Sequence, residues 1–212
     1  MPDGSNVSPA INDRDRALEL VPALREIESQ LVVYEDLLRR WQMRMNLVGR
    51  STLSEIWTRH FADSGQLLSD AAVNKRWADL GSGAGFPGLV LSLLQGRNEG
   101  EMHLIESDTR KAAFLREVSR ETGSRAVVHN SRVEDVIGDI DPSIVTSRAM
   151  ADIAILFRAA RPFVEKGGAG LFLKGRDIAA ELTRASIPSN FAVRLRPSKV
   201  DPASSVVLIE RA

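Results

Sequence analysis

The spacing of apolar side chains divides the chain into a helical first third and a longer part in which strands and helices alternate. Apolar residues recur every three or four positions over residues 24–45 and again over residues 51–68, which predicts two amphipathic helices. A shorter capped helix is predicted just before the first of these. Residues 1–11 are polar, with Pro and Gly, and predict a disordered lead-in. We therefore expect an N-terminal helical extension over residues 12–74.

From residue 75 onward the apolar runs are short and alternate with stretches of helical spacing. This alternation predicts a mostly parallel sheet with helices on both faces. The last two strands are too close in sequence for a helical crossover, so we expect an antiparallel pair. The predicted fold class is α/β, a seven-stranded Rossmann-like sheet over residues 75–212 with an antiparallel C-terminal strand. The predicted strands are 77–80, 102–105, 126–129, 144–146, 170–173, 191–196 and 205–210, and the helices between them are 86–94, 109–122, 133–137, 152–163 and 178–185.

A glycine-rich stretch at residues 79–88 follows the first predicted strand. Glycine at a strand-to-helix turn lets the backbone approach a ligand closely. The next apolar run ends at Glu106, where a βαβ nucleotide-binding fold presents a carboxylate to a ribose. We therefore predict a nucleotide cofactor at this edge of the sheet. The glycines of the stretch are Gly81, Gly83, Gly85 and Gly88.

Two cofactor classes fit this loop to different degrees. The spacing Gly83-x-Gly85-x-x-Gly88 matches a dinucleotide fingerprint, so a nicotinamide-dependent oxidoreductase or a cofactor-binding regulatory module is one alternative. Asp79 opposes it, because a carboxylate there repels a pyrophosphate. No Lys or Arg follows before Leu94 to assist a phosphate. S-adenosylmethionine, with its ammonium and sulfonium charges, fits an Asp-containing loop better, and the antiparallel sheet end is typical of class I methyltransferases.

Composition excludes several other functions. The chain has 212 residues, 43% of them apolar, which suits one sizeable core. It has no cysteine, so disulfides, thiolate zinc sites and cysteine nucleophiles are excluded, and its three histidines show no metal-ligand spacing. No membrane-spanning run or secretory signal is visible, which predicts a cytoplasmic protein. No hydrophobic stripe beyond the needs of a core is evident, so we expect a monomer by default. The net charge is zero, so an RNA substrate requires a local basic face.

Several motifs, in the same order along the chain, are similar to those of one protein family. The resemblance is to the RsmG (GidB) family, the bacterial 16S rRNA guanine-N7 methyltransferases, and covers residues 15–210. Val48 stands where this family usually has Thr, and Ala62 where a larger apolar residue is common; both departures look minor. The motifs are Asp79-Leu-Gly-Ser-Gly-Ala-Gly-Phe-Pro-Gly88, Glu106-Ser-Asp, Lys111-x-x-Phe-Leu115, Ser131-Arg-Val-Glu134, Thr146-Ser-Arg-Ala149, Leu173-Lys-Gly175, Asn46-Leu47 and Arg59-His-Phe-Ala-Asp-Ser64.

The resemblance implies methyl transfer from S-adenosylmethionine to N7 of one guanine in 16S rRNA or the small ribosomal subunit. It implies that Gly81 and Phe86 contact the cofactor, that Val133 and Glu134 lie by the adenine, and that Arg148 reaches the methionine end or the target. Another RNA or small-molecule methyltransferase remains an alternative. The expected RNA contacts are Asn46, Arg59, His60, Lys174 and Arg176, and the expected cofactor contacts are Asp79, Gly81, Gly83, Gly85, Phe86, Glu106, Val133, Glu134 and Arg148.

The chemistry of the reaction assigns some of these roles without the resemblance. Guanine N7 carries an in-plane lone pair and no proton, so methylation there requires alignment and exclusion of water, and we assign no acid–base residue. Glu106 suits the ribose hydroxyls, and Asp79 suits the loop backbone or a cationic methionine group. Arg148 and Lys174 follow the fourth and fifth predicted strands, at the carboxyl edge where open α/β sheets bind their substrates, so we expect both to position the target.

Overall fold

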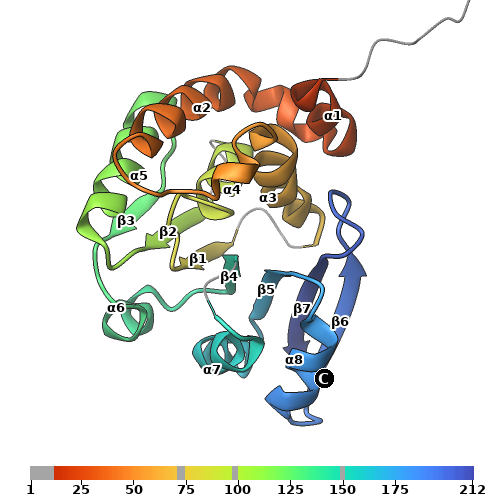
Figure 1. The fold of residues 1–212 in the computed structure, drawn as a ribbon. Coiled ribbons are helices and arrows are strands. Elements are labelled where there is room, and N and C mark those ends of the chain that lie inside the picture. The colour runs from red at the N-terminus through yellow and green to blue at the C-terminus, as the bar shows by residue number, and fades with distance from the viewer. Residues whose placement is uncertain (1–11, 71–74, 97–99, 149–150) are drawn as a thin grey trace, which may run out of the picture.

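The computed structural model describes residues 12–70, 75–96, 100–148 and 151–212, so the predicted lead-in at residues 1–11 lies outside the described residues. Seven strands form one sheet in the order β3-β2-β1-β4-β5-β7-β6 (Figure 1). All neighbouring strands are parallel except at β7, which is antiparallel to both β5 and β6. The α/β prediction with an antiparallel C-terminal strand is confirmed. The strands are β1 Arg76–Leu80, β2 Glu101–Ile105, β3 Val127–His129, β4 Ile144–Arg148, β5 Ala169–Lys174, β6 Phe191–Pro197 and β7 Ser205–Arg211.

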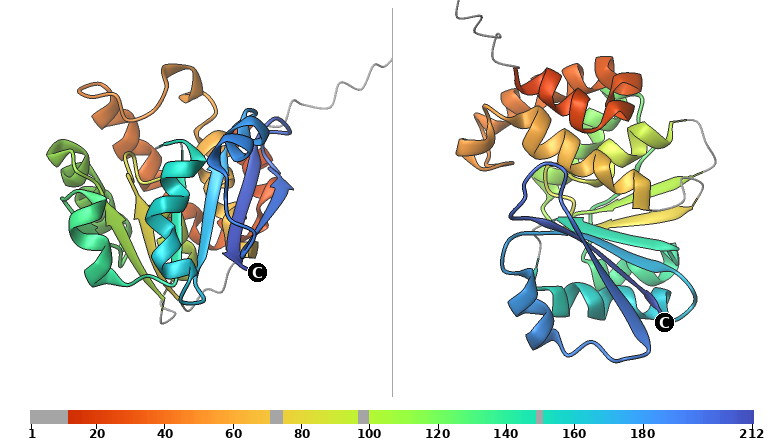
Figure 2. Two further views of the ribbon diagram at one scale, coloured as in Figure 1. Left: turned by 90° about the horizontal axis from the view of Figure 1, so that it is seen from below. Right: turned by 90° about the vertical axis from the view of Figure 1, so that its right-hand side faces the viewer.

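Helices cover both faces of the sheet, as the two side views show (Figure 2). Alternation along β1 explains this, because Trp77 belongs to one hydrophobic cluster and its neighbour Ala78 to the other. One face packs against the N-terminal helices, α4 (Gly88–Gln95) and α5 (Thr109–Thr122). The other packs against α6 (Val133–Ile140), α7 (Ile153–Val164) and α8 (Ile178–Ala185).

The N-terminal segment contains α1 (Asp13–Leu20), the 3₁₀ helix Pro22–Ile27 and α2 (Glu28–Gln42). The Asn12 side chain caps α1 by accepting a hydrogen bond from the Asp15 backbone N–H. Pro22 begins the 3₁₀ helix at a position where its missing N–H costs nothing. The prediction that the long amphipathic helix continues to Met45 is wrong, because α2 ends at Gln42.

The second predicted helix, over residues 51–68, is wrong as a continuous element. The segment consists of the 3₁₀ helix Arg50–Thr52, a π-helical turn Trp57–Ala62, α3 (Asp63–Gly65) and a 3₁₀ helix Gln66–Asp70. Asp13 fixes where the π-helical turn begins, since its carboxylate accepts hydrogen bonds from the backbone N–H groups of Trp57 (2.9 Å) and Thr58 (3.1 Å). Apolar spacing alone does not report such a long-range cap. The widened turn carries Arg59 and His60, in keeping with the frequent occurrence of π-turns at functional sites.

The hydrophobic core on this face runs across the predicted boundary at residue 75. Tyr34 of α2, Trp77 of β1 and Phe114 of α5 are all fully buried in one cluster. Tyr34 also donates a hydrogen bond to the carbonyl of Ala84, which lies in the glycine-rich loop. The N-terminal helices therefore form one wall of the core that supports the loop.

The loop after β1 packs so closely that two of its glycines have no room for a side chain. A Cβ on Gly88, the first residue of α4, would lie 2.3 Å from Leu104 and 2.7 Å from the Asp79 carboxylate. A Cβ on Gly85, whose φ is +88°, would lie 2.3 Å from the Tyr34 hydroxyl. Close backbone approach thus fixes both positions.

We expect Gly88→Ala to lower the free energy of unfolding by about 1–3 kcal/mol, because the new methyl group displaces Leu104 or the Asp79 carboxylate. Gly138→Ala in α6 is the matched control, since its Cβ would meet nothing within 4 Å. There the loss of glycine's backbone freedom should raise stability by about 0.5–1 kcal/mol. Urea titrations of both variants measure the difference. Equal effects at the two positions would contradict the close packing under the loop.

Candidate active site

The carboxyl ends of the parallel strands carry the predicted site residues and border two cavities. The larger, about 550 Å³, lies beside the glycine-rich loop and the ends of β2 and β3. The smaller, about 350 Å³, lies between the π-helical turn, the end of β5 and the β6–β7 connection. Arg148, the last residue of β4, lines both. The order of the strands therefore places one arginine in the wall shared by two adjacent cavities.

The larger cavity brings together five of the predicted cofactor residues together with Arg148. Glu106 lies at its edge and is only 7% exposed. Its carboxylate accepts hydrogen bonds of 2.8 Å from the backbone N–H groups of Gly83 and Asp108, so it is fixed between the loop and the start of α5. The chemistry of this lining suits a nucleoside, with a held carboxylate, loop backbone and apolar walls. The lining includes Gly81, Gly83, Glu106, Lys111, Ser131, Arg132, Val133, Glu134, Arg148, Ala151, Ile155 and Ala159.

Asp79 lies beneath the glycine-rich loop and does not line either cavity. Its side chain is fully buried, and one carboxylate oxygen accepts a hydrogen bond from the Gly88 backbone N–H at 3.2 Å. Burial raises the pKa of Asp79 from its ordinary value of 3.8 to about 7, against the opposing effect of its hydrogen bonds and of Arg148. Of the two roles predicted for Asp79, organisation of the loop is the one that these contacts support.

Phe86 is 3% exposed and connects the glycine-rich loop to the N-terminal helices. The Tyr34 ring stacks on it at a centroid distance of 5.4 Å, and the His60 ring does so at 4.9 Å. The Arg148 guanidinium lies over the same ring, 4.7 Å from its centroid. Phe86 and the equally buried Gly85 are not among the residues that line the larger cavity. Their contacts support Arg148 and the loop from behind.

A directed chain of hydrogen bonds holds Arg148. Its Nη1 donates to the Arg59 carbonyl at 3.1 Å and lies 2.8 Å from His60 Nδ1. Because a guanidinium has only donors, Nδ1 is the acceptor, and the ring proton is assigned to Nε2, which lies 2.8 Å from the Thr52 hydroxyl. Thr52 in turn donates to the Gly49 carbonyl at 2.8 Å.

His60 is neutral in this arrangement. Burial and the neighbouring charges of Arg148 and Arg59 lower its pKa from 6.5 to about 3. Burial also lowers the pKa of the Arg148 guanidinium, while Asp63, Tyr34 and Asp79 act against that shift. The imidazole thus serves as an acceptor that fixes the orientation of an arginine.

The smaller cavity contains three ion pairs or near pairs on its walls. Arg59 pairs with Asp201 at 3.0 Å, and Asp63 lies 3.9 Å from Arg148 Nη1. Lys174 is 9% exposed and pairs with Glu181 at 2.7 Å, so its charge is already compensated inside the cavity wall. The other residues of the lining are Thr52, His60, Leu173, Gly175, Val200 and Ser204.

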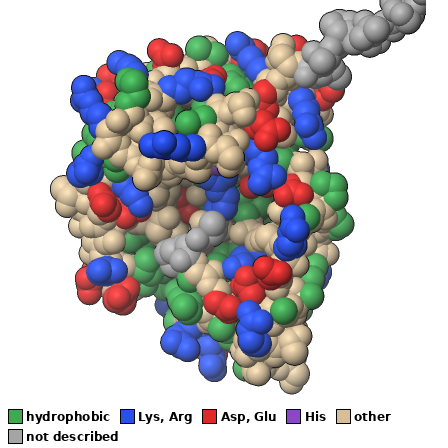
Figure 3. All heavy atoms as spheres, viewed as in Figure 1, with side chains coloured by type: hydrophobic (Ala, Val, Ile, Leu, Met, Phe, Trp, Pro, Cys, Tyr) green, Lys and Arg blue, Asp and Glu red, His purple; other side chains and the backbone are tan. Residues whose placement is uncertain are grey.

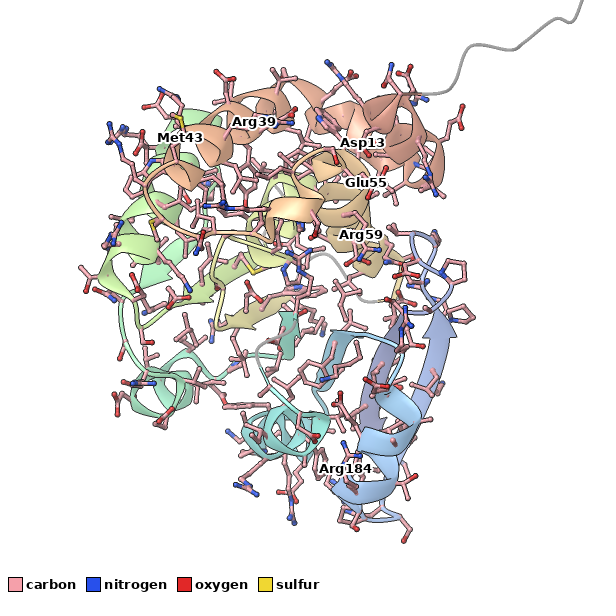
Figure 4. All side chains as sticks on the ribbon, in the orientation of Figure 1. Asp13, Arg39, Met43, Glu55, Arg59 and Arg184 are labelled. Atoms are coloured by element: carbon pink, nitrogen blue, oxygen red, sulfur yellow. The ribbon has the colours of Figure 1, made fainter. Side chains whose placement is uncertain are left out.

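The structure brings Arg59, His60 and Lys174 to this cavity but leaves two of the predicted RNA contacts apart from it. Asn46 is exposed in the connection after α2, and Arg176 is exposed in the turn after β5. Neither lines one of the two cavities. Basic side chains gather around the hollow in the middle of the face that Figure 3 shows. Arg59 lies between the N-terminal helices and the β6–β7 connection (Figure 4).

Sequence reasoning did not identify Tyr34, Thr52 or Asp63 as parts of the site. Tyr34 is a regular apolar position of α2, and only its tertiary contacts distinguish it. Asp63 belongs to the Arg59–Ser64 motif, but its residue type and spacing assigned it no role in the site. Within the described ranges, no group of three or more His, Cys, Asp or Glu side chains is arranged to hold a metal ion. In the same part of the chain, no helix combines the length and apolar character needed to cross a bilayer.

Comparison with known proteins identifies the family. The model of the family described as "GidB: rRNA small subunit methyltransferase G" matches residues 27–198. The chain belongs to this family. A ribosomal RNA small subunit methyltransferase G of Nitrobacter hamburgensis is 45% identical over 94% of this chain and 78% of its own length. One of Methylobacterium nodulans is 44% identical over 93% of this chain and 95% of its own. The predicted resemblance is confirmed, and the methyltransferase prediction prevails over the nicotinamide-dependent alternative.

Solved structures of more distant proteins show the fold. A mutant of MtNAS in complex with S-adenosylmethionine superposes with a TM-score of 0.57 at 18% identity, covering 94% of this chain and 76% of that one. The fibrillarin/Nop5p complex gives a TM-score of 0.54 at 14% identity, covering 72% and 80%. Family membership and this fold together confirm the class I methyltransferase prediction.

We expect Asp79→Asn to remove a pH dependence of stability. As the pH rises from about 4, the unfolded Asp79 carboxyl ionises while the folded one, with a pKa of about 7, stays protonated. The contribution of Asp79 to the free energy of unfolding of the wild type therefore falls progressively up to about pH 7. The asparagine variant has no such decrease. Urea unfolding at pH 5 and pH 7.5 measures the difference.

His60 acts in the opposite sense, because its lowered pKa makes the wild type lose stability as the pH falls below 6.5. Both proteins retain His60, so the difference between them isolates Asp79. The free energy of unfolding of Asp79→Asn relative to the wild type should rise between the two pH values. A difference that does not change with pH would contradict the buried, protonated carboxyl.

Proposed function

We propose that this member of the rRNA small subunit methyltransferase G family transfers a methyl group from S-adenosylmethionine to N7 of one guanine in 16S rRNA. Family membership supports the reaction and the substrate class. The observation that carries the site assignment is the position of Arg148 in the wall between two adjacent cavities. Two substrates that exchange a group need two such compartments, with a shared boundary where the reacting atoms meet.

The larger cavity is the proposed cofactor site. S-adenosylmethionine supplies an electrophilic methyl group on its sulfonium. Glu106 accepts hydrogen bonds from the ribose hydroxyls there, because its carboxylate already stands at the end of β2 and retains unused acceptor capacity. Gly81 and Gly83 present backbone beside the cofactor, with φ of 64° and 56°. Val133 supplies an apolar wall for the adenine, and Glu134 stands next to it on α6.

The smaller cavity is the proposed site for the target guanine. Guanine N7 has a lone pair and no proton, so it accepts a methyl group without a general base. The state of His60 agrees with a reaction that needs no general base. Its Nδ1 is occupied by Arg148, and its pKa of about 3 leaves it unable to exchange protons near neutral pH. The work of this chain's residues is then to orient the base, hold Arg148 in place and exclude water.

The RNA around the target guanine is proposed to cross the rim of the smaller cavity. Arg59 is the rim cation, with a side chain that is 42% exposed. Lys174 is proposed to act from inside, by positioning the end of β5 through its bonds to Glu181 and to the Ala151 carbonyl (2.8 Å). A direct contact between Lys174 and RNA, which was expected from the sequence, would first require the ion pair with Glu181 to open.

The function is tested with small ribosomal subunits from a strain that lacks this gene. The purified protein and methyl-labelled S-adenosylmethionine should label one guanine, located by strand cleavage at N7-methylguanine. Label at another atom or another base would contradict the assigned reaction. Absence of cofactor binding, measured by calorimetry, would contradict the assignment of the larger cavity.

We expect Arg148→Ala to reduce the methylation rate by about 10²- to 10³-fold, the usual effect of removing a preorganised charged donor from an active site. Arg148→Lys should restore little, because an ammonium does not reproduce a planar guanidinium that lies over Phe86 and donates to His60. Glu106→Ala should instead weaken cofactor binding by about tenfold or more, through the lost ribose contact. Single-turnover rates and calorimetric dissociation constants separate the two effects.

We expect Arg59→Ala to weaken binding to small subunits and to make it less sensitive to salt, by about one unit in the slope of log K against log salt concentration. Arg184→Ala is the matched control. Arg184 is also an exposed arginine paired with an aspartate, Asp152, but it lies on α8, away from Arg59 (Figure 4). Filter binding at several salt concentrations measures both variants. An equal effect of the two substitutions would show that Arg59 contributes only bulk charge.

A further inference from the structure

Asp63 presents one carboxylate oxygen, Oδ2, to the smaller cavity. This oxygen has no hydrogen-bond partner among the described residues. Its Oδ1 accepts from Gln66 Nε2 at 2.8 Å and from the Ser198 hydroxyl at 3.5 Å, which fixes the carboxylate in place. Among residues 12–70, 75–96, 100–148 and 151–212, no donor lies within hydrogen-bonding distance of Oδ2, and Arg148 Nη1 is 3.9 Å away. The side chain is 17% exposed and lines the cavity.

Arg148, whose Nη1 lies 3.9 Å from this oxygen, carries two nitrogens with unused donors. Its contacts with His60 and the Arg59 carbonyl are both made by Nη1. Nε and Nη2 have no hydrogen-bond partner within the part of the chain that the structure describes. The wall of the cavity therefore carries a fixed donor, from Arg148, next to a fixed acceptor, from Asp63. Arg148 also borders the cofactor cavity, whereas Asp63 does not.

This order of groups matches one edge of guanine. Around the base, N7 is followed by the O6 acceptor, then by the N1–H donor and the N2 amino donor. With N7 facing the cofactor cavity, O6 falls at Arg148 and the two donors fall at Asp63. Adenine has an amino donor in place of O6 and an acceptor at N1. It would therefore place a donor against the Arg148 donors and an acceptor against the Asp63 carboxylate.

We propose that Asp63 reads the Watson–Crick edge of the target guanine, accepting hydrogen bonds from N1–H and the N2 amino group while Arg148 donates to O6. This inference rests on the proposed function and adds the residue that selects the base. Burial raises the pKa of Asp63, which shows that the carboxylate is poorly solvated before RNA binds. A base that donates two hydrogen bonds compensates this lost solvation, and an isostere that lacks them does not.

The competing role for Asp63 is that of a counter-ion that holds Arg148 in place. Loss of a counter-ion would change the methylation rate of every substrate equally. Loss of a residue that recognises the base edge would change the rate of each substrate according to the hydrogen-bond donors on that edge. Inosine separates the two, because it retains N7, O6 and N1–H and lacks only the N2 amino group. The comparison of guanine and inosine at one position, in the wild type and in an Asp63 variant, isolates the contact between Asp63 and that group.

The experiment uses small subunits reconstituted with 16S rRNA in which the methylated guanine is retained or replaced by inosine through splinted ligation. Single-turnover methylation is measured for the wild type, Asp63→Ala, Asp63→Asn and Asp201→Ala. The wild type should prefer guanine by about 10- to 100-fold, the usual effect of one charge-assisted hydrogen bond. Asp63→Ala should methylate guanine more slowly and prefer it by less than twofold, with Asp63→Asn between the two.

Asp201→Ala is the control, since Asp201 lines the same cavity but is paired with Arg59. It should keep the wild-type preference for guanine whatever its effect on RNA affinity. Binding of S-adenosylhomocysteine should remain within about twofold of wild type in both Asp63 variants, because Asp63 does not border the cofactor cavity.

Three results would overturn the inference. The first is a wild-type protein that methylates guanine and inosine equally well. The second is an Asp63→Ala variant that keeps the full preference for guanine. The third is a loss of cofactor binding in the Asp63 variants, which would mark Asp63 as a support for Arg148. A wild-type protein that binds the cofactor but methylates no guanine in guanine-containing subunits would overturn the proposed function, and this inference with it. Activity on guanine with an unchanged preference in Asp63→Ala would overturn the inference alone.

Discussion

The stack on Phe86 is the interaction on which both cavities depend. Three groups from separate parts of the chain meet this one ring: Tyr34 from α2, His60 from the π-helical turn and Arg148 from the end of β4. The ring itself belongs to the glycine-rich loop, so the loop and the arginine pack against each other through it. The larger cavity, which the loop borders, and the guanidinium that lines both cavities are thereby coupled through one buried side chain.

Burial also explains why several ionisable side chains of the site carry no uncompensated charge. His60 is kept neutral, Asp79 titrates near neutrality, and Lys174 is compensated by Glu181. The guanidinium of Arg148 remains the charged group at the boundary of the two cavities. Its partner Nδ1 is an uncharged acceptor, so this hydrogen bond orients the arginine without cancelling its charge, and Asp63 lies 3.9 Å from Nη1. Such an arrangement suits alignment of a base whose reacting atom needs no proton transfer.

The sheet and the edge that carries the candidate site were predictable from sequence because the relevant signals are local. The apolar runs marked every strand, and the glycines with Glu106 marked the ligand edge. The broken helix at residues 51–68 was not predictable, because Asp13 determines it from 44 residues away. The burial of Lys174 likewise depends on Glu181 in α8, and that of Phe86 depends on Tyr34 in α2. Residue type and spacing indicated which edge carries the candidate site, but not which side chains line its cavities.

Because the β6–β7 connection forms part of the smaller cavity only, the two cavities are completed at different stages of synthesis. The residues that line the larger cavity all lie between Gly81 and Ala159, so all of them have been synthesised once α7 has left the ribosome. The smaller cavity is completed only when Asp201 reaches Arg59 and Ser198 reaches Asp63, after nearly the whole chain has been made. On the proposed assignment, a nascent chain thus carries every residue of its methyl-donor site before it carries those of the compartment for the target base.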